Sequence, residues 1–275
     1  MALFNLGKGN LTNGHRENTF FEPSQKRTLQ TNWKTFEEQG LNKQSISDVF
    51  AGSIPAIRQK EFLSQEECWK MVEVLKSHKI CDQGTYDIDH VWPRVGCWHS
   101  SDRSQKETYF SGVKNAYSLQ DRWKKELGID IMERSAHSLR EASGMVVRLA
   151  REGERDYFAV VILAINTGIQ IHADYAPFEG NGWEIGRVAA QMSWNILLNP
   201  VPGADTFIYD RQWQAPQDDL PWRKDFPMYA YDPCIVDGHV LKVLRAGATH
   251  TLHRELIRRL PAGSGGEANT LLLWT

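Results

Sequence analysis

The stretch Ile169-Gln170-Ile171-His172-Ala173-Asp174-Tyr175 decides how the rest of the chain is interpreted. Residues two apart in an extended segment point to the same side, so His172 and Asp174 can hold one metal ion from a single strand end. A third ligand must come from a distant segment, and His250 and His253 follow much later in the chain. Two histidines and one carboxylate are the ligand set of an iron site that keeps open positions for oxygen chemistry.

Short apolar runs typical of β-strands recur from Gly144 onward, separated by Gly, Pro and Asn turn signals. We expect strands at 145–149, 157–165, 169–172, 191–198, 206–209, 234–236, 240–244, 249–252 and 270–274. Many short strands at this spacing predict a sandwich or a barrel.

Helical patterns precede the strands. Ser64 and Glu67 form a capping-box pair, Ser118 with Asp121 opens a second expected helix, and a third covers 133–141. Helices followed by strands predict an α+β fold in which the helices brace one sheet. We expect a polar N-terminal arm at 1–50 and one domain at 51–275, helical over 51–143 and β-rich over 144–275.

The composition excludes several classes of protein. The 275 residues carry a formal net charge of −2, which gives no electrostatic case for nucleic acid. The four cysteines form no C-x-x-C pair, which favours reduced thiols in a cytoplasmic protein. We expect neither a signal peptide nor a membrane-spanning segment. The ten tryptophans suit a sizeable core or a lined pocket.

The order of the motifs in 144–274 resembles that of the iron(II)- and 2-oxoglutarate-dependent dioxygenases. His172-Ala173-Asp174 comes first, and Trp194-Asn-Ile-Leu-Leu-Asn199 follows as a strand ending in asparagine. Gly203-Ala-Asp-Thr-Phe-Ile-Tyr-Asp-Arg-Gln-Trp213 is similar to a stretch of the smaller members. Asp237-Gly-His-Val-Leu-Lys-Val-Leu244 resembles the strand before the distal histidine. The resemblance implies a double-stranded β-helix (jelly-roll) core, with Fe(II), 2-oxoglutarate and molecular oxygen as cofactor and co-substrates.

Within this resemblance, His172, Asp174 and His250 are the expected iron ligands. The spacing after Leu244 favours His250, and His253 stays open as the alternative. The family commonly anchors the far carboxylate of 2-oxoglutarate with a basic residue at the start of the last strand. Here that strand begins Glu267-Ala-Asn269, so the candidates are Arg254, Arg258 and Arg259.

Other polar residues are weaker candidates. Gln191, Ser193 and Asn195 alternate along one expected strand, and Gln191 and Asn195 are candidates for co-substrate binding. Arg148 in an apolar run is either paired or holds a substrate anion. Arg211 and Trp213 are candidates for the mouth of the site.

These observations predict an oxygenase that hydroxylates, desaturates or cyclises a small polar molecule, such as an amino acid or a natural-product intermediate. We expect no nucleic-acid or membrane partner and leave a homodimer open. Two alternatives remain: a cupin-like jelly-roll binding protein without turnover, and an iron oxygenase that does not use 2-oxoglutarate.

Overall fold

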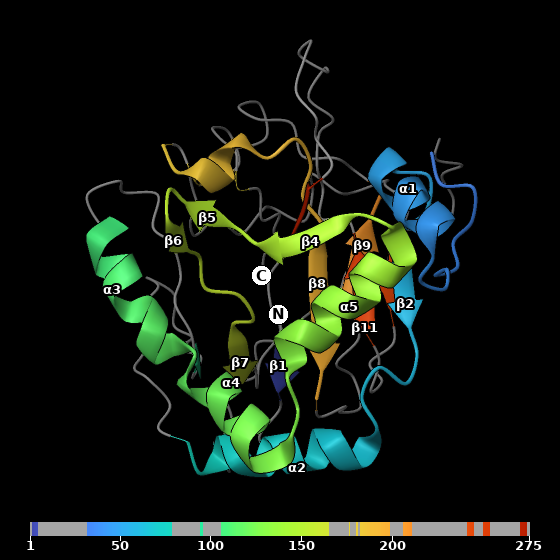
Figure 1. Ribbon diagram of the computed structural model, residues 1–275. Coiled ribbons are helices and arrows are strands. Elements are labelled where there is room, and N and C mark those ends of the chain that lie inside the picture. The colour runs from blue at the N-terminus through green and yellow to red at the C-terminus, as the bar shows by residue number, and fades with distance from the viewer. Residues whose placement is uncertain are drawn as a thin grey trace, which may run out of the picture.

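The computed structural model describes residues 2–4, 32–78, 94–95, 106–164, 176, 180, 182–198, 206–210, 241–244, 250–253 and 270–273. A mixed six-stranded sheet lies at its centre, with helices across one face (Figure 1). The strands of this sheet are β1 (Ala2–Phe4), β2 (Ala56–Gln59), β3 (Arg94–Val95), β7 (Ile162–Ala164), β8 (Ser193–Leu197) and β11 (His250–His253).

The order of the sheet is β2-β11-β8-β1-β7-β3, so strands far apart in the sequence lie side by side. Strand β11 is antiparallel to both of its neighbours, β2 and β8. Strand β1 is parallel to β7 and to β8, and β3 pairs antiparallel with β7. The sheet is therefore built largely from long-range pairings.

Three two-stranded sheets accompany the central one. They pair β4 (Val146–Leu149) with β12 (Thr270–Leu273), β5 (Arg151–Glu152) with β6 (Arg155–Asp156), and β9 (Thr206–Tyr209) with β10 (Leu241–Leu244). The β9–β10 pair joins two segments that carry the family resemblance. No closed barrel is formed by the strands in the described ranges, and the double-stranded β-helix stays a prediction.

The helices are α1 (Lys43–Ala51), α2 (Gln65–Lys76), α3 (Lys106–Ala116), α4 (Ser118–Arg122) and α5 (Ile131–Ser143). The capping box expected at Ser64 and Glu67 is confirmed, with each side chain bonded to the other residue's backbone. A second capping box, Asn42 with Ser45, starts α1. Helix α1 spans residue 50, at which the sequence placed the end of the N-terminal arm; the arm and the domain boundary stay predictions.

The capping role expected of Ser118 is wrong. Helix α4 follows α3 after one residue, Tyr117, and no side-chain cap bond starts it. The Ser118 hydroxyl instead lies 3.3 Å from Nε2 of His78. A π-helical turn, Trp123–Leu127, continues α4 and buries Trp123 completely, as its apolar spacing predicts.

Two faces of the central sheet are covered differently. On one face, Ile57 of β2 and Trp194 and Ile196 of β8 pack in the main core with residues of α1, α2 and α5. On the other face, Ala56 of β2 packs with Trp33 and with Ile208 of β9. The sheet thus lies between a helical layer and a second β element.

The strand expected over 157–165 is wrong in its first half, since only Ile162–Ala164 is extended in the sheet. Val160 has φ 68°, a conformation that β-branched residues rarely adopt. Several backbone N–H and C=O groups of the largely buried segment 157–161 instead form hydrogen bonds with side chains of the helical layer. Tyr109 and Tyr117 accept from the N–H groups of Phe158 and Ala159, and Gln120 donates to the Val160 carbonyl at 3.0 Å.

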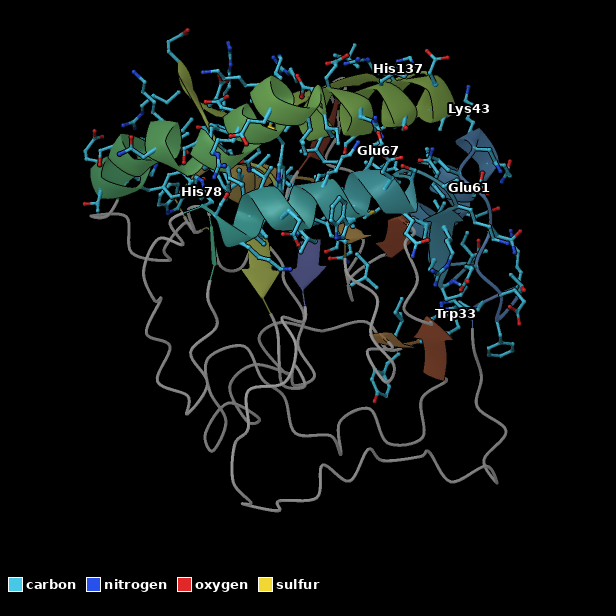
Figure 2. All side chains as sticks on the ribbon, turned by 90° about the horizontal axis from the view of Figure 1, so that it is seen from below. Trp33, Lys43, Glu61, Glu67, His78 and His137 are labelled. Atoms are coloured by element: carbon cyan, nitrogen blue, oxygen red, sulfur yellow. The ribbon has the colours of Figure 1, made fainter. Side chains whose placement is uncertain are left out.

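The helical layer carries many exposed charged side chains, and the two histidines labelled in Figure 2, His78 and His137, lie well apart on it. His137 is exposed, and burial lowers the pKa of His78. No helix in the described parts of the chain combines the length and the apolar character needed to cross a membrane.

Candidate functional site

The strand that carries the two candidate distal histidines lies inside the central sheet, second from one edge, between β2 and β8. Strand β11 places position 250 opposite Gln59 and Ile196, and position 253 opposite Ala56 and Ser193. The expected strand with Asn195 is thus a direct neighbour of the histidine strand, with Thr251 opposite Asn195.

Strand β8 alternates between the two faces of the sheet. Trp194 and Ile196 are buried in the core below the helices, whereas Ser193, Asn195 and Leu197 are half-buried on the opposite face. Of the three polar residues expected to alternate along this strand, Ser193 and Asn195 share one face of β8, whereas Gln191 lies before the strand begins. In the pairing of β11 with β8, position 253 lies opposite Ser193 of this face, and position 250 lies opposite Ile196 of the helical face.

Most of the other candidates lie outside the described residues: His172, Asp174, Arg211, Trp213, Arg254, Arg258 and Arg259. Within the described ranges, no three His, Cys, Asp or Glu side chains gather in a way that could hold a metal ion. The site can therefore be built only from the segments that flank the motif, which are β7 before it and residues 176–191 after it.

The segment after the motif is fixed to the start of β8 by Gln191. Its side chain is 5% exposed, and Oε1 accepts a 2.7 Å hydrogen bond from the backbone N–H of Ala176, two residues beyond Asp174. The Nε2 atom is buried and has no hydrogen-bond partner within the described part of the chain. Native structures seldom leave such a donor unpaired, so this atom marks a place where an acceptor belongs.

Two glycines make the following turn compact. The N–H of Gly180 donates to the Ala176 carbonyl at 2.7 Å, and a Cβ on Gly180 would lie 2.9 Å from that carbonyl oxygen. A Cβ on Gly186 would overlap the carbonyl oxygen of Gly180. The close approach of the backbone at Ala176, Gly180 and Gly186 therefore requires glycine at both positions.

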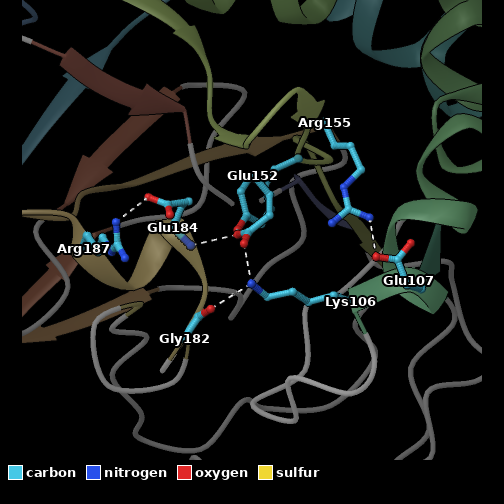
Figure 3. A network of polar contacts seen from close by, with 8 residues as sticks. Lys106, Glu107, Glu152, Arg155, Gly182, Glu184 and Arg187 are labelled. Atoms are coloured by element: carbon cyan, nitrogen blue, oxygen red, sulfur yellow. Dashed lines mark hydrogen bonds and ion pairs between the residues drawn. The ribbon is translucent and has the colours of Figure 1, made fainter.

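A charged network holds the same turn from outside (Figure 3). Lys106 of α3 pairs with Glu152 of β5 and donates to the Gly182 carbonyl at 2.8 Å. Glu152 also accepts from the hydroxyl of Tyr157 and from the N–H of Glu184 at 2.8 Å. The network links α3, the β5–β6 hairpin and the turn.

These contacts shift the titration of the groups involved. Burial alone raises the pKa of Glu152, but the donors from Lys106, Tyr157 and Glu184 outweigh it and hold the pKa below its usual value. Burial, followed by the bond to Glu152, strongly raises the pKa of Tyr157. Glu152 is therefore ionised and Tyr157 is neutral near neutral pH, which is the protonation that the hydrogen bonds require.

Aromatic side chains pack against the buried residues of the turn. Ala176 is buried in a cluster with Tyr109, Tyr157, Phe158 and Trp183. The rings of Tyr109 and Trp183 meet edge to face with centroids 5.5 Å apart. Hydrogen bonds made next to this cluster act in a low effective dielectric, which strengthens them.

Arg148 does not occupy the environment that its sequence suggested. Its side chain is exposed on β4, and the neighbouring Val147 points into the core instead. Because water solvates an exposed guanidinium, Arg148 needs neither a buried partner nor a bound anion.

Sequence reasoning missed the elements that support the turn. Lys106 and Glu152 lie in separate segments with no motif that connects them. Gly180 and Gly186 looked like ordinary turn residues, because their spacing does not show which carbonyl each approaches.

Comparison with known proteins shows a similarity to a protein of a biosynthesis cluster. The chain is 40% identical over 158 residues to "Leucinostatins biosynthesis cluster protein S" of Purpureocillium lilacinum, over 56% of this chain and 65% of that protein. The match thus spans less than two thirds of the relative's length. A comparison with known protein families finds none whose pattern matches this chain.

Proposed function

We propose that the protein is an iron(II)- and 2-oxoglutarate-dependent oxygenase that acts on a small polar molecule in a natural-product pathway. The observation that carries the proposal is the pairing of β11 with β8, because it brings the distal histidine strand alongside the strand of Asn195. The named relative belongs to a biosynthesis cluster, which supports the pathway role.

In this proposal the motif supplies the metal ligands. His172 and Asp174 would hold Fe(II). His250, which the spacing favours, would complete the set; His253 is the alternative, and its position pairs with Ser193 on the face of β8 that also carries Asn195. When bound, Fe(II) would supply oxygen activation; two electrons would come from 2-oxoglutarate, released as succinate and CO2, and two from the substrate. Hydroxylation, desaturation and ring closure are the outcomes open to such chemistry.

The protein's own residues would bind and orient the reactants. Asn195 and Gln191 would donate hydrogen bonds to a co-substrate oxygen. The half-buried position of Asn195 on β8 and the buried Nε2 of Gln191 support this role. Arg254 or Arg259 would bind the far carboxylate, for which the planar guanidinium is suited. Arg211 and Trp213 would line the entrance.

One feature of the described residues fits a bound 2-oxoglutarate. The donor left over at Gln191 requires an acceptor, and a carboxylate is a strong one. The aromatic cluster buries Ala176 two residues after Asp174, which suits a reaction that must be protected from solvent.

The composition supports two further parts of the proposal, the class of substrate and the compartment. The net charge of −2 favours a small-molecule substrate over nucleic acid, and the unpaired cysteine pattern favours the cytoplasm. A homodimer stays open.

The first test is direct. Purified protein is given Fe(II) and 2-oxoglutarate without oxygen, and the weak visible charge-transfer band is recorded. We expect the band in the wild type and its loss in Asp174→Ala, whereas His137→Ala, on an exposed position of α5, keeps it. Absence of the band and of retained iron in the wild type would favour a binding protein without turnover.

A second experiment separates the two histidines. His250→Ala and His253→Ala are compared for Fe(II) affinity and for succinate formation. The variant that loses both identifies the distal ligand, and the register of β11 makes the comparison informative because the two positions pair with opposite faces of β8. Oxygen uptake that persists without 2-oxoglutarate would instead support the other iron oxygenase class.

A further inference from the structure

The side chain of Gln191 has a fixed orientation. Its Oε1 atom accepts from the N–H of Ala176 at 2.7 Å, so Nε2 must point the other way. The residue is 95% buried, since its exposed fraction is 5%, and it lies directly before β8. One end of the amide is therefore used, and the other end is a donor held in place.

The acceptor for this donor is absent from the described residues. Nε2 is buried and has no partner among them. A buried amide donor without a partner carries a desolvation penalty, which a charged oxygen removes more effectively than a neutral one. Gln191 contacts the backbone two residues after Asp174 and immediately precedes β8, which carries Ser193 and Asn195. We therefore expect the missing acceptor to be a carboxylate of the proposed site.

We propose that Gln191 is a positioning residue that links the strand end to a bound carboxylate. Its carbonyl fixes the backbone just after Asp174, and its N–H group donates to a carboxylate of the site. This inference rests on the proposed function. The carboxylate belongs either to Asp174 or to the anionic co-substrate, and the two sources have different consequences for binding.

Another buried glutamine provides a matched control. Gln120 on α4 is 7% exposed, donates through Nε2 to the Val160 carbonyl, and has a buried Oε1 without a partner in the described part of the chain. It belongs to the helical layer, and its hydrogen bond goes to Val160 and not to the turn after the motif. Gln120→Glu therefore reproduces the chemical change at a buried site of another kind.

The decisive variant is Gln191→Glu. The glutamate keeps the shape of the side chain and an oxygen that accepts from the Ala176 N–H. It replaces the amide donor with a second oxygen, and while the glutamate is ionised this oxygen repels a bound carboxylate. When protonated, the introduced carboxyl regains a donor. Gln191→Met keeps the approximate shape and removes both functions, so its binding defect has no recovery of this kind.

The assay measures the dissociation constant of Fe(II) without oxygen, and then that of 2-oxoglutarate in the presence of Fe(II), from pH 5.5 to 8. Every value is expressed relative to the wild type at the same pH. We expect Gln191→Glu to weaken binding at least about tenfold at neutral pH, with recovery as the pH falls. Gln191→Met should show a loss that does not recover, and Gln120→Glu should bind as the wild type does.

Each outcome decides the inference. A loss confined to 2-oxoglutarate assigns the donor to the co-substrate carboxylate, and a loss that begins with Fe(II) assigns it to Asp174. Wild-type binding with Gln191→Glu within twofold at all pH values overturns the inference alone. A wild type that binds neither ligand overturns the proposed function and, with it, the carboxylate partner of Gln191.

Discussion

Replacing Lys106 with methionine tests whether the network in Figure 3 holds the turn that follows the motif. Methionine keeps much of the aliphatic volume and removes the charge and all donors. The variant loses the ion pair with Glu152, the hydrogen bond to the Gly182 carbonyl, and the contact of Nζ over the Trp183 ring at 5.2 Å.

The size of the effect follows from the burial of the pair. The side chains of Lys106 and Glu152 are 21% and 12% exposed, so little water replaces the lost partner. Removing one partner of a buried ion pair costs about 3–5 kcal/mol. Because Glu152 keeps its bonds to Tyr157 and Glu184, we expect the low end, about 3 kcal/mol. In a domain of this size that loss lowers the unfolding midpoint by about 6–12 °C.

The assay is urea unfolding of the wild type, Lys106→Met, Glu152→Gln and the double variant. A double-mutant cycle should give a coupling free energy of about 1.5 kcal/mol or more between the two positions. Arg151→Met is the control, because its pair with Asp156 lies on the same hairpin with side chains 53% and 42% exposed. The reasoning is refuted if Lys106→Met destabilises no more than Arg151→Met, or if the cycle shows no coupling.

Three further predictions concern the same region. Since the pKa of Glu152 is lowered in the folded protein, its stabilisation is full above its ordinary value of 4.5 and is lost as pH falls through the lowered pKa. The stability difference between wild type and Glu152→Gln should therefore shrink in acid, and a constant difference from pH 7 to 3 would contradict this. Gly186→Ala should destabilise by about 1–3 kcal/mol in urea unfolding through overlap with the Gly180 carbonyl. Gly40→Ala, where a Cβ meets nothing within 4 Å, should not, and equal effects would count against the close approach. Val160→Gly should destabilise less than Val161→Gly by about 1 kcal/mol or more, because glycine relieves the positive φ at Val160. The same measurement giving the reverse order would show that Val160 is not strained.

Local signals in the sequence predicted local structure well. The Ser64–Glu67 capping box and the apolar spacing behind it predicted α2, and the alternation of Ser193 to Leu197 predicted β8 and its two faces. These features depend on neighbours within a few residues, so the pattern alone contains the needed information.

Structure that depends on distant partners could not be predicted in the same way. The sequence 157–161 is apolar and looks extended, but Tyr109, Tyr117 and Gln120 take over its backbone hydrogen bonds. The Lys106–Glu152 pair likewise forms only after α3 and the hairpin have come together. For the candidate site, the sequence identified Gln191 as a candidate for co-substrate binding. Its hydrogen bond to the N–H of Ala176 could not be predicted, because it depends on how the segment after the motif packs.

The position of β11 between β2 and β8 also determines how the chain must fold. Residues 56–59 and 193–197 cannot pair with their shared neighbour until residues 250–253 have been synthesised. Until then both strands present unpaired edges, which are prone to associate with other chains. A chain shortened before residue 250 should therefore aggregate rather than form a smaller domain. In the full chain, the same long-range pairing should slow folding.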